Sequence, residues 1–291
     1  LWITVRWIPK LIFSWNSFWE LFSFGSKLLA SGLLDTIYNN IYTIVIGKFF
    51  SAKSLGVYSR ADGLAQFPSS NITSVLQSVT FPVLSTIQDD ETRLADAYKR
   101  FLRLSAFIVF PLMVGLSAVA DPFVRIVLTD KWEGTIYFLQ ILCFGLMWYP
   151  IHAINLNLLR VKGRSDYFLK LEVIKKILGV ATLCVTIPMG LEAMCYGRVF
   201  TSVVCLALNT YYTGKIIEYG FLSQMKDLLH IIAHSFVMYG IVFVIVHYLP
   251  NLWSQLFVGT FTGTIYYFIG AYLMKFDEFS ELLSLLKLKK A

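Results

Sequence analysis

The stretch FLRLSAFIVFPLMVGLSAVA, residues 101–120, decides the fold class, because Arg103 is its one charged residue. A bilayer core about 30 Å thick is crossed by roughly 20 helical residues. Its interior has no water to satisfy an open backbone. The rest of the sequence agrees, since 57% of its 291 residues are hydrophobic and 15% are charged, whereas soluble domains carry about 25% charged residues. The chain is therefore predicted to be an all-α integral membrane protein.

About eight segments are long enough to cross a bilayer when polar interruptions are allowed. Pro or Gly stands at many of their ends, as at Pro68, Gly163 and Gly190. Gly259 and Gly263 form a small-xxx-small pair that predicts close helix packing. The predicted spans are residues 26–49, 68–87, 101–120, 135–159, 167–188, 192–213, 227–249 and 252–274.

The basic residues gather on one side of the predicted membrane. The sequence has 25 Lys and Arg against 18 Asp and Glu, for a net charge of +7. If the first span runs outward, 17 of the 25 fall on the starting side, and Lys175 and Lys176 fall within a span. Cytoplasmic loops collect Lys and Arg, so both ends of the chain are predicted to be cytoplasmic. The remaining six lie on the outer side: Lys48, Lys53, Arg60, Arg125, Lys131 and Arg198.

Recognisable catalytic, cofactor and metal motifs are missing from the sequence. It contains no phosphate-binding P-loop, no H-E-x-x-H and no G-x-S-x-G. His230 and His234 are four residues apart, but no Glu or Cys joins them within a turn, which favours packing over metal binding. The four cysteines lie in apolar stretches without metal-ligand spacing. The chain is therefore predicted not to be an enzyme and to need no cofactor or metal.

In the first predicted span, Asp35, Asn39 and Tyr42 share one helical face. A charged side chain at membrane depth costs roughly 2.5–3.5 kcal/mol on insertion scales. Asp35 and Asn39 are therefore predicted to face protein or water. A helix–helix hydrogen bond and the wall of a transport cavity both meet this requirement.

The span 68–87 has a polar stripe opposite an apolar one. A membrane-length helix of this kind must turn its polar stripe to a bundle interior or to a water-filled cavity. A helix lying on the membrane surface is the alternative, but such helices usually carry more Lys and Arg. The polar stripe consists of Ser70, Thr73, Ser74, Gln77 and Thr80, and the apolar one of Ile72, Leu76, Val79, Val83 and Ile87.

The fourth predicted span contains Pro150, His152 and Asn155, and it is predicted to be a kinked helix with a hydrogen-bonding face. Such a helix suits a gate or a cavity wall. Simple packing is the alternative for His152.

The fifth predicted span carries three charges near its start. Glu172 is predicted to pair with Lys176, four residues further on. Lys175 and Lys176 can either extend to the cytoplasmic headgroups or attract an anion inside a cavity.

Several short stretches in the first third of the sequence resemble one family of transporters. They are similar to the polysaccharide-transport (Wzx-like) flippases of the MATE-like superfamily, and most of all to exporters of colanic-acid or exopolysaccharide repeat units. The stretches are YNNIY (38–42), VIGKF (45–49), LGVYSRA (55–61), PSSN (68–71) and VTFPVLS (79–85).

The resemblance implies a fold of fourteen spans, with two six-helix bundles facing each other across a cavity and two helices added at the end. Residues 1–25 would then be a linker from a missing N-terminal half, residues 26–213 the second bundle, and residues 214–291 the two added helices and a cytoplasmic tail. The implied activity is the movement of an undecaprenyl-pyrophosphate-linked oligosaccharide across the bacterial inner membrane by alternating access. The implied partners are the N-terminal bundle and a polysaccharide polymerase machinery, without nucleic acid.

Two other functions compete with the flippase. A drug or cation antiporter of the same architecture would use a carboxylate such as Asp35 as its ion site. A membrane-embedded polymerase or acyltransferase would need a catalytic group in a large loop, and the loops here are short. For the flippase, Asp35, Asn39, Gln77 and Asn155 are predicted to be hydrogen-bonding groups of the cavity wall, with Lys175 and Lys176 attracting the anionic part of the cargo.

Overall fold

The computed structural model describes residues 14, 15, 18, 19, 22, 26, 29, 33 and 36–288, with side chains as far as residue 284. The chain divides into two compact units, Leu1–Val45 and Ile46–Ala291. Residues 36–39 of the first unit are helical, and helix α3 (Ile41–Phe49) begins in the first unit and ends in the second. Within the predicted span 26–49, residues 27, 28, 30–32 and 34, together with Asp35, lie outside the described residues.

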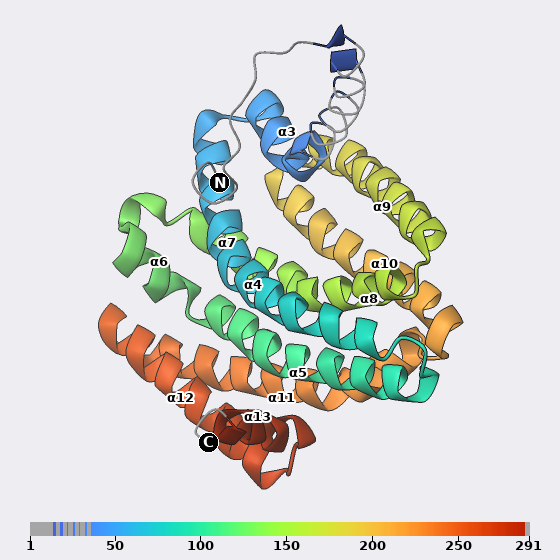
Figure 1. The fold of residues 1–291 in the computed structure, drawn as a ribbon. Coiled ribbons are helices and arrows are strands. Elements are labelled where there is room, and N and C mark those ends of the chain that lie inside the picture. Colours follow the sequence, from blue (N-terminus) through green and yellow to red (C-terminus); the bar gives the residue numbers. More distant parts are fainter. Residues whose placement is uncertain are drawn as a thin grey trace, which may run out of the picture. The chain divides into compact units, whose positions relative to one another are not determined.

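The second unit consists of helices joined by short turns (Figure 1). Residues 36–288 contain no β-strand, so the all-α prediction is confirmed over the described part of the chain. The α-helices are α4 (Ala52–Thr86), α5 (Glu91–Ala118), α6 (Ala120–Leu128), α7 (Thr135–Leu146), α8 (Tyr149–Val161), α9 (Ser165–Thr186), α10 (Leu191–Ile217), α11 (Phe221–Tyr248), α12 (Leu252–Leu273) and α13 (Asp277–Leu288). Two 3-10 turns, η1 (Asp130–Trp132) and η2 (Ile187–Met189), lie between them.

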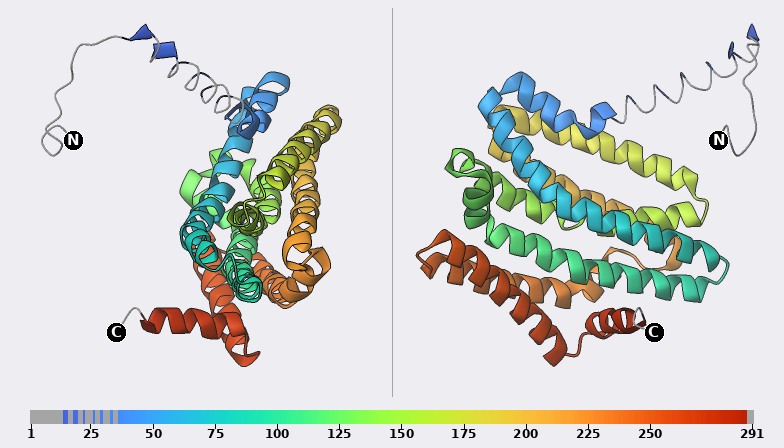
Figure 2. Two further views of the ribbon diagram at one scale, coloured as in Figure 1. Left: turned by 45° about the vertical axis from the view of Figure 1, so that its right-hand side comes forward. Right: turned by 60° about the vertical axis from the view of Figure 1, so that its left-hand side comes forward.

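The long helices of this unit pack side by side (Figure 2). Helix α12 packs on α11, and α11 packs on α5. Helix α5 contacts α4, α7 and α8, while α10 packs on α7 and α8, and α9 packs on α10. The core lies around α5, where Tyr98, Phe107, Phe110 and Met113 are fully or almost fully buried. Helices α9 and α12 are therefore at the two edges of the unit.

Successive long helices run in opposite directions, so their turns collect at two ends of the unit (Figure 1). At one end lie the turns 87–90, 162–164 and 218–220. There Lys162 Nζ donates to the carbonyl of Gln88 at 2.8 Å and ties two of these turns together. We call this the Lys162 end. Helix α6 and η1 lie at the other end, which we call the Arg125 end.

In the part of the chain that the structure describes, five helical segments are long and apolar enough to cross a membrane, so this is a multi-pass membrane protein. They are Glu91–Ala118, Thr135–Val161, Leu191–Ile217, Phe221–Tyr248 and Leu252–Leu273. Helices α4 and α9 are also of membrane length, but the Ser, Thr and Gln residues of α4 and the five charged residues of α9 lower their hydropathy. The count of eight spans remains a prediction.

One predicted span is much shorter than the helix that contains nearly all of it, and another is broken in the middle. The span predicted for residues 68–87 is part of a 35-residue helix, α4, which begins at Ala52 and keeps Pro68 in its interior. Ser51 caps this helix, because its hydroxyl accepts from the Ser54 amide at 3.1 Å. Proline is tolerated inside a membrane helix where neighbours satisfy the freed carbonyl. The predicted kink near Pro150 is confirmed as a break between α7 and α8.

Glycines 259 and 263 hold α12 against α11, as the small-xxx-small spacing predicts. A Cβ atom added at Gly263 would lie 2.8 Å from Val242 Cγ2, and one added at Gly259 would lie 2.9 Å from Val246 Cγ2. Larger side chains at either position would therefore push the two helices apart.

Candidate functional site

Helix α4 has three different faces, and the difference between them defines the candidate site. One face is buried, a second is polar and at least partly exposed, and a third is apolar and exposed. The buried face contains Ala61, Ala65, Ser69, Thr73 and Thr80. The polar face, as we call it below, contains Gln66, Ser70, Ser74 and Gln77, and what we call the apolar face contains Phe67, Val75 and Val79. The exposed Asn71 and Ser78 lie between Phe67 and Val75, where they donate to the carbonyls of Phe67 and Val75 in their own helix.

The buried face packs against α7 and α8. Ser69 Oγ donates to the carbonyl of Leu146 at 2.8 Å, and Thr73 Oγ1 donates to the carbonyl of Ser69 at 2.7 Å. Thr73 and Thr80, which are 1% and 0% exposed, therefore meet the bundle-interior alternative of the prediction, and the structure divides the predicted stripe between this seam and a second face. Their small size allows close helix approach, and periodicity alone cannot distinguish a seam of this kind from a cavity wall.

The polar face turns away from this seam. Ser70 and Gln77 are half-buried, whereas Gln66 and Ser74 are exposed. Val75, one residue after Ser74, is 66% exposed on the apolar face. Because amide and hydroxyl groups are costly to leave in hydrocarbon, the polar face requires water or another polar surface, while the apolar face suits lipid. The predicted site residue Gln77 lies on the polar face.

Helix α9 places an ion pair against the interior of the unit. Lys175 Nζ lies 2.6 Å from Glu172 Oε1, and the two side chains are 16% and 32% exposed. Glu172 therefore pairs with Lys175, three residues further on, in place of the predicted partner Lys176, four residues further on. The charge of Lys175 acts on the imidazole of His152 in α8 and on the thiol of Cys205 in α10. Lys176, the next predicted site residue, is half-buried on the same helix.

Asn155 belongs to a buried hydrogen-bond network that joins three helices. Its side chain is 0% exposed. Its Oδ1 atom accepts from Thr213 Oγ1 in α10 at 2.7 Å, and its amide exchanges two hydrogen bonds of 3.3 Å with Gln224 in α11. Asn155 thus faces α10 and α11 instead of open space. A buried polar group that is fully bonded fixes the packing of its helices.

His152 lies one turn before Asn155 and continues the polar contacts toward the middle of the helices. Its Nδ1 atom is 3.0 Å from Asn209 Nδ2, and its Nε2 atom is 3.2 Å from Ser202 Oγ. Ser202 in turn donates to the carbonyl of Gly145 at 3.0 Å. The hydrogen-bonding face predicted for α8 is therefore confirmed as a set of contacts with α10.

Sequence reasoning missed a charge cluster near the Arg125 end. Arg198 Nη1 in α10 donates to Asp62 Oδ1 at 2.6 Å and to Tyr58 Oη at 2.7 Å, both in α4. The Arg198 and Asp62 side chains are 24% and 22% exposed. More than 130 residues separate these partners along the chain, so no local sequence pattern predicts the pair. Charges at such depth are uncommon and usually functional or structurally paired.

The predicted residues of the first span cannot be added to this arrangement. Asp35 lies outside the described residues, and Asn39 is exposed in the first unit. Within the second unit, the structure brings Lys175 near His152, one turn from Asn155, while Gln77 lies on the polar face of α4. Among the residues that the structure describes, no group of three or more His, Cys, Asp or Glu could hold a metal ion.

These features define a class: a helical, multi-pass membrane protein with one long helix that is buried, polar and apolar on its different faces. The structure resembles that of the lipid II flippase MurJ in an inward closed conformation, with a TM-score of 0.73 at 16% identity, over 91% of this chain and 57% of MurJ. At this identity the likeness concerns the fold alone.

Sequence comparisons identify the relatives of the chain. Residues 1–137 match the family described as "Polysaccharide biosynthesis protein". The teichuronic acid biosynthesis protein TuaB of Bacillus subtilis is 24% identical over 267 residues, which cover 90% of this chain and 55% of TuaB. The lipopolysaccharide biosynthesis protein WzxC of Escherichia coli is 31% identical over 178 residues, covering 61% of this chain and 36% of WzxC. The resemblance to the polysaccharide-transport flippases is thereby confirmed.

The chain spans about half the length of these relatives or less. Its described helices therefore correspond to part of what the relatives contain.

Proposed function

We propose that this chain forms part of a transporter that moves a lipid-linked oligosaccharide across the bacterial inner membrane for surface polysaccharide synthesis. The polar face of α4 carries the proposal, because it places amide and hydroxyl groups along a helix of membrane length, beside an apolar face. A hydrated sugar head can follow such a surface while its lipid tail stays in the bilayer. The relatives' roles in teichuronic acid and lipopolysaccharide biosynthesis support this cargo class.

The proposed mechanism is alternating access between two bundles. Residues 26–213 would form one bundle, residues 214–291 would add two helices and a tail, and residues 1–25 would link to an N-terminal bundle of the same protein. A polar surface between two bundles is exposed first to one side and then to the other as the bundles rock. The Lys162 end, with most of the cations, would face the cytoplasm together with both ends of the chain. A polysaccharide polymerase would accept the exported units.

The proposed roles of the site residues follow from their positions. Gln77 would hydrogen-bond the glycan from the polar face of α4, and Asn39 and Asp35 would do so from the first span. Lys175 and Lys176 would attract the anionic part of the cargo, with Glu172 holding Lys175 in place. Asn155 would act through α8, by fixing that helix against α10 and α11.

Replacement of Gln77 tests the proposal. In the complete protein, Gln77→Leu should lower surface polysaccharide severalfold at unchanged protein level, because a wall amide is replaced by an alkyl group. Asn71→Leu is the matched control, since Asn71 is an exposed polar residue of α4 outside the polar face. It should export normally. Normal export by Gln77→Leu would remove the polar face from the pathway.

A further inference from the structure

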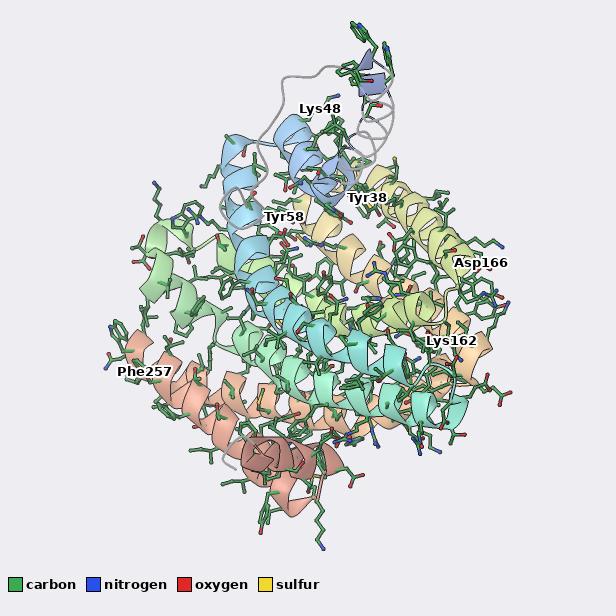
Figure 3. The ribbon with its side chains drawn as sticks, viewed as in Figure 1. Tyr38, Lys48, Tyr58, Lys162, Asp166 and Phe257 are labelled. Atoms are coloured by element: carbon green, nitrogen blue, oxygen red, sulfur yellow. The ribbon has the colours of Figure 1, made fainter. Side chains whose placement is uncertain are left out.

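Rings and cations meet at the Lys162 end, where α9 begins and α10 finishes. The Tyr167 and Tyr212 rings lie 5.0 Å apart, and the Tyr211 and Tyr212 rings lie 5.4 Å apart. Lys215 Nζ is 4.5 Å from the Tyr211 ring centre, and Arg164 Cζ is 3.8 Å from that of Tyr167. We call these five residues the tyrosine–cation patch. Figure 3 shows the neighbouring Lys162 and Asp166 at this corner.

The patch keeps positive charge at an accessible surface. Tyr211 is 56% exposed, and Lys215 is exposed beside it. Aromatic faces hold ammonium and guanidinium groups without neutralising them, so Lys215 is positioned and still charged. Asp166 binds Arg164 through two hydrogen bonds, of 3.0 and 2.9 Å, and offsets that one charge.

A further cation lies beside the patch. Arg160, in the last turn of α8, lies 4.8 Å from the Phe168 ring centre of α9. Together, Arg160, Arg164 and Lys215 exceed Asp166 by two positive charges. A diphosphate that joins a lipid to a sugar is dianionic, so the charges are complementary. Cations of this kind bind phosphate oxygens strongly.

Helix α9 leads from this corner into the unit. Phe168 lies one turn before Glu172 and on the same face as Lys175. An anion bound beside Arg160 would therefore be one to two turns from the buried end of the Glu172–Lys175 pair. Bulk phospholipids do not need a path along α9 toward this ion pair. They also carry no sugar that could contact the exposed Tyr211 ring.

We infer that the tyrosine–cation patch, with Arg160, is the cytoplasmic loading site for the diphosphate and first sugar of the cargo, an inference that rests on the proposed function. Lys215 and Arg160 would bind the phosphate oxygens, and the Tyr211 ring would stack against the sugar. The site selects a membrane-anchored sugar diphosphate over a phospholipid because it offers both contacts at once.

Binding of a defined probe tests this site. The complete protein is placed in nanodiscs of phosphatidylethanolamine, and its affinity for undecaprenyl pyrophosphate carrying one sugar is measured. Removal of both cations by Arg160→Gln with Lys215→Gln should weaken binding about 25-fold, at about fivefold for each surface cation. The matched control, Arg93→Gln with Lys226→Gln, removes two exposed cations that lie outside the patch and should change binding less than twofold.

The outcomes separate the site from the proposed function. If the wild type fails to bind the probe, the loading site and the proposed function are both overturned. If the wild type binds and the Arg160/Lys215 variant binds equally well, the loading site alone is overturned. Full displacement of the probe by phosphatidylglycerol would also overturn the loading site, because the patch would then bind phospholipids in general. The inference expects phosphatidylglycerol to compete weakly, and the variant to unfold at the wild-type temperature because its changed side chains lie at the surface.

Discussion

The two ends of the helical unit surround their arginines with different partners. At the Arg125 end, the Arg125 guanidinium binds Asp121, Asp130 and Glu133 at 2.9, 3.0 and 2.7 Å. These three carboxylates raise the pKa of Arg125 and exceed its charge. At the Lys162 end, Lys215 and Arg160 lie over aromatic rings that leave their charge in place. The charge of Arg125 is thus cancelled, whereas Lys215 and Arg160 keep theirs. Each end also has a cation of the other kind, because Arg60 lies 5.2 Å from the Trp132 ring centre near Arg125, and Arg164 pairs with Asp166 near Lys215.

The largest effect is expected at Arg198, which lies near the Arg125 end and pairs with a carboxylate that is 22% exposed. Arg198→Gln should destabilise the protein by about 3 kcal/mol, because it leaves the Asp62 carboxylate largely buried without its partner. Thermal unfolding in detergent micelles measures the loss. The double variant with Asp62→Asn should recover much of it. Equal unfolding temperatures for the single and double variants would contradict a paired charge at this depth.

Arg125 itself should have a smaller effect. Arg125→Gln should cost about 0.5–1 kcal/mol, since three carboxylates then repel one another without a cation between them, at a largely exposed site. Arg164→Gln at the opposite end is the matched control, because Arg164 has one carboxylate partner and a more exposed side chain. We expect a clearly lower unfolding temperature for the Arg125 variant only. Equal losses in both variants would remove the contrast between the ends.

The smallest effect concerns Asp166, the carboxylate that pairs with Arg164 of the patch. The Arg164 guanidinium lowers the pKa of Asp166 to about 2. Because this pKa is lowered, the stabilisation is present above the ordinary carboxyl pKa and is lost only as the pH falls through about 2. The Arg164–Asp166 pair should therefore be unchanged between pH 5 and 8. Carbon NMR of the Asp166 carboxyl checks this, and a midpoint near pH 4, equal to that of the Arg164→Gln variant, would contradict it.

Much of the fold could be predicted from the sequence, because membrane crossing imposes length and hydropathy on a contiguous stretch. All but the last two residues of the predicted span 101–120 lie within α5, and the packing of Gly263 on Val242 follows from its spacing to Gly259. The start of α4 could not be predicted, since its first half contains Lys53, Arg60 and Asp62 and does not look like a membrane span.

The sequence predicted which residue types occur at the candidate site, but not which residues they contact. Gln77 follows from helical phase, but the same phase cannot separate it from Thr73, whose burial depends on how closely α7 and α8 approach. Asn155 was identified as a hydrogen-bonding residue, while its partners Thr213 and Gln224 lie 58 and 69 residues further on. Such contacts are set by tertiary packing, which a single sequence does not encode in a local pattern.

The most direct test of the account is the water accessibility of two adjacent residues of α4. Ser74 lies on the polar face, and Val75 is exposed on the apolar face. Each is changed to cysteine in a complete protein whose exposed Cys184 is replaced by serine, and intact cells and inverted vesicles are treated with a charged thiol reagent. The account predicts that Ser74→Cys reacts from at least one side and that Val75→Cys does not. Failure of Ser74→Cys to react from either side, or equal reaction at both positions, would contradict a hydrated path along α4.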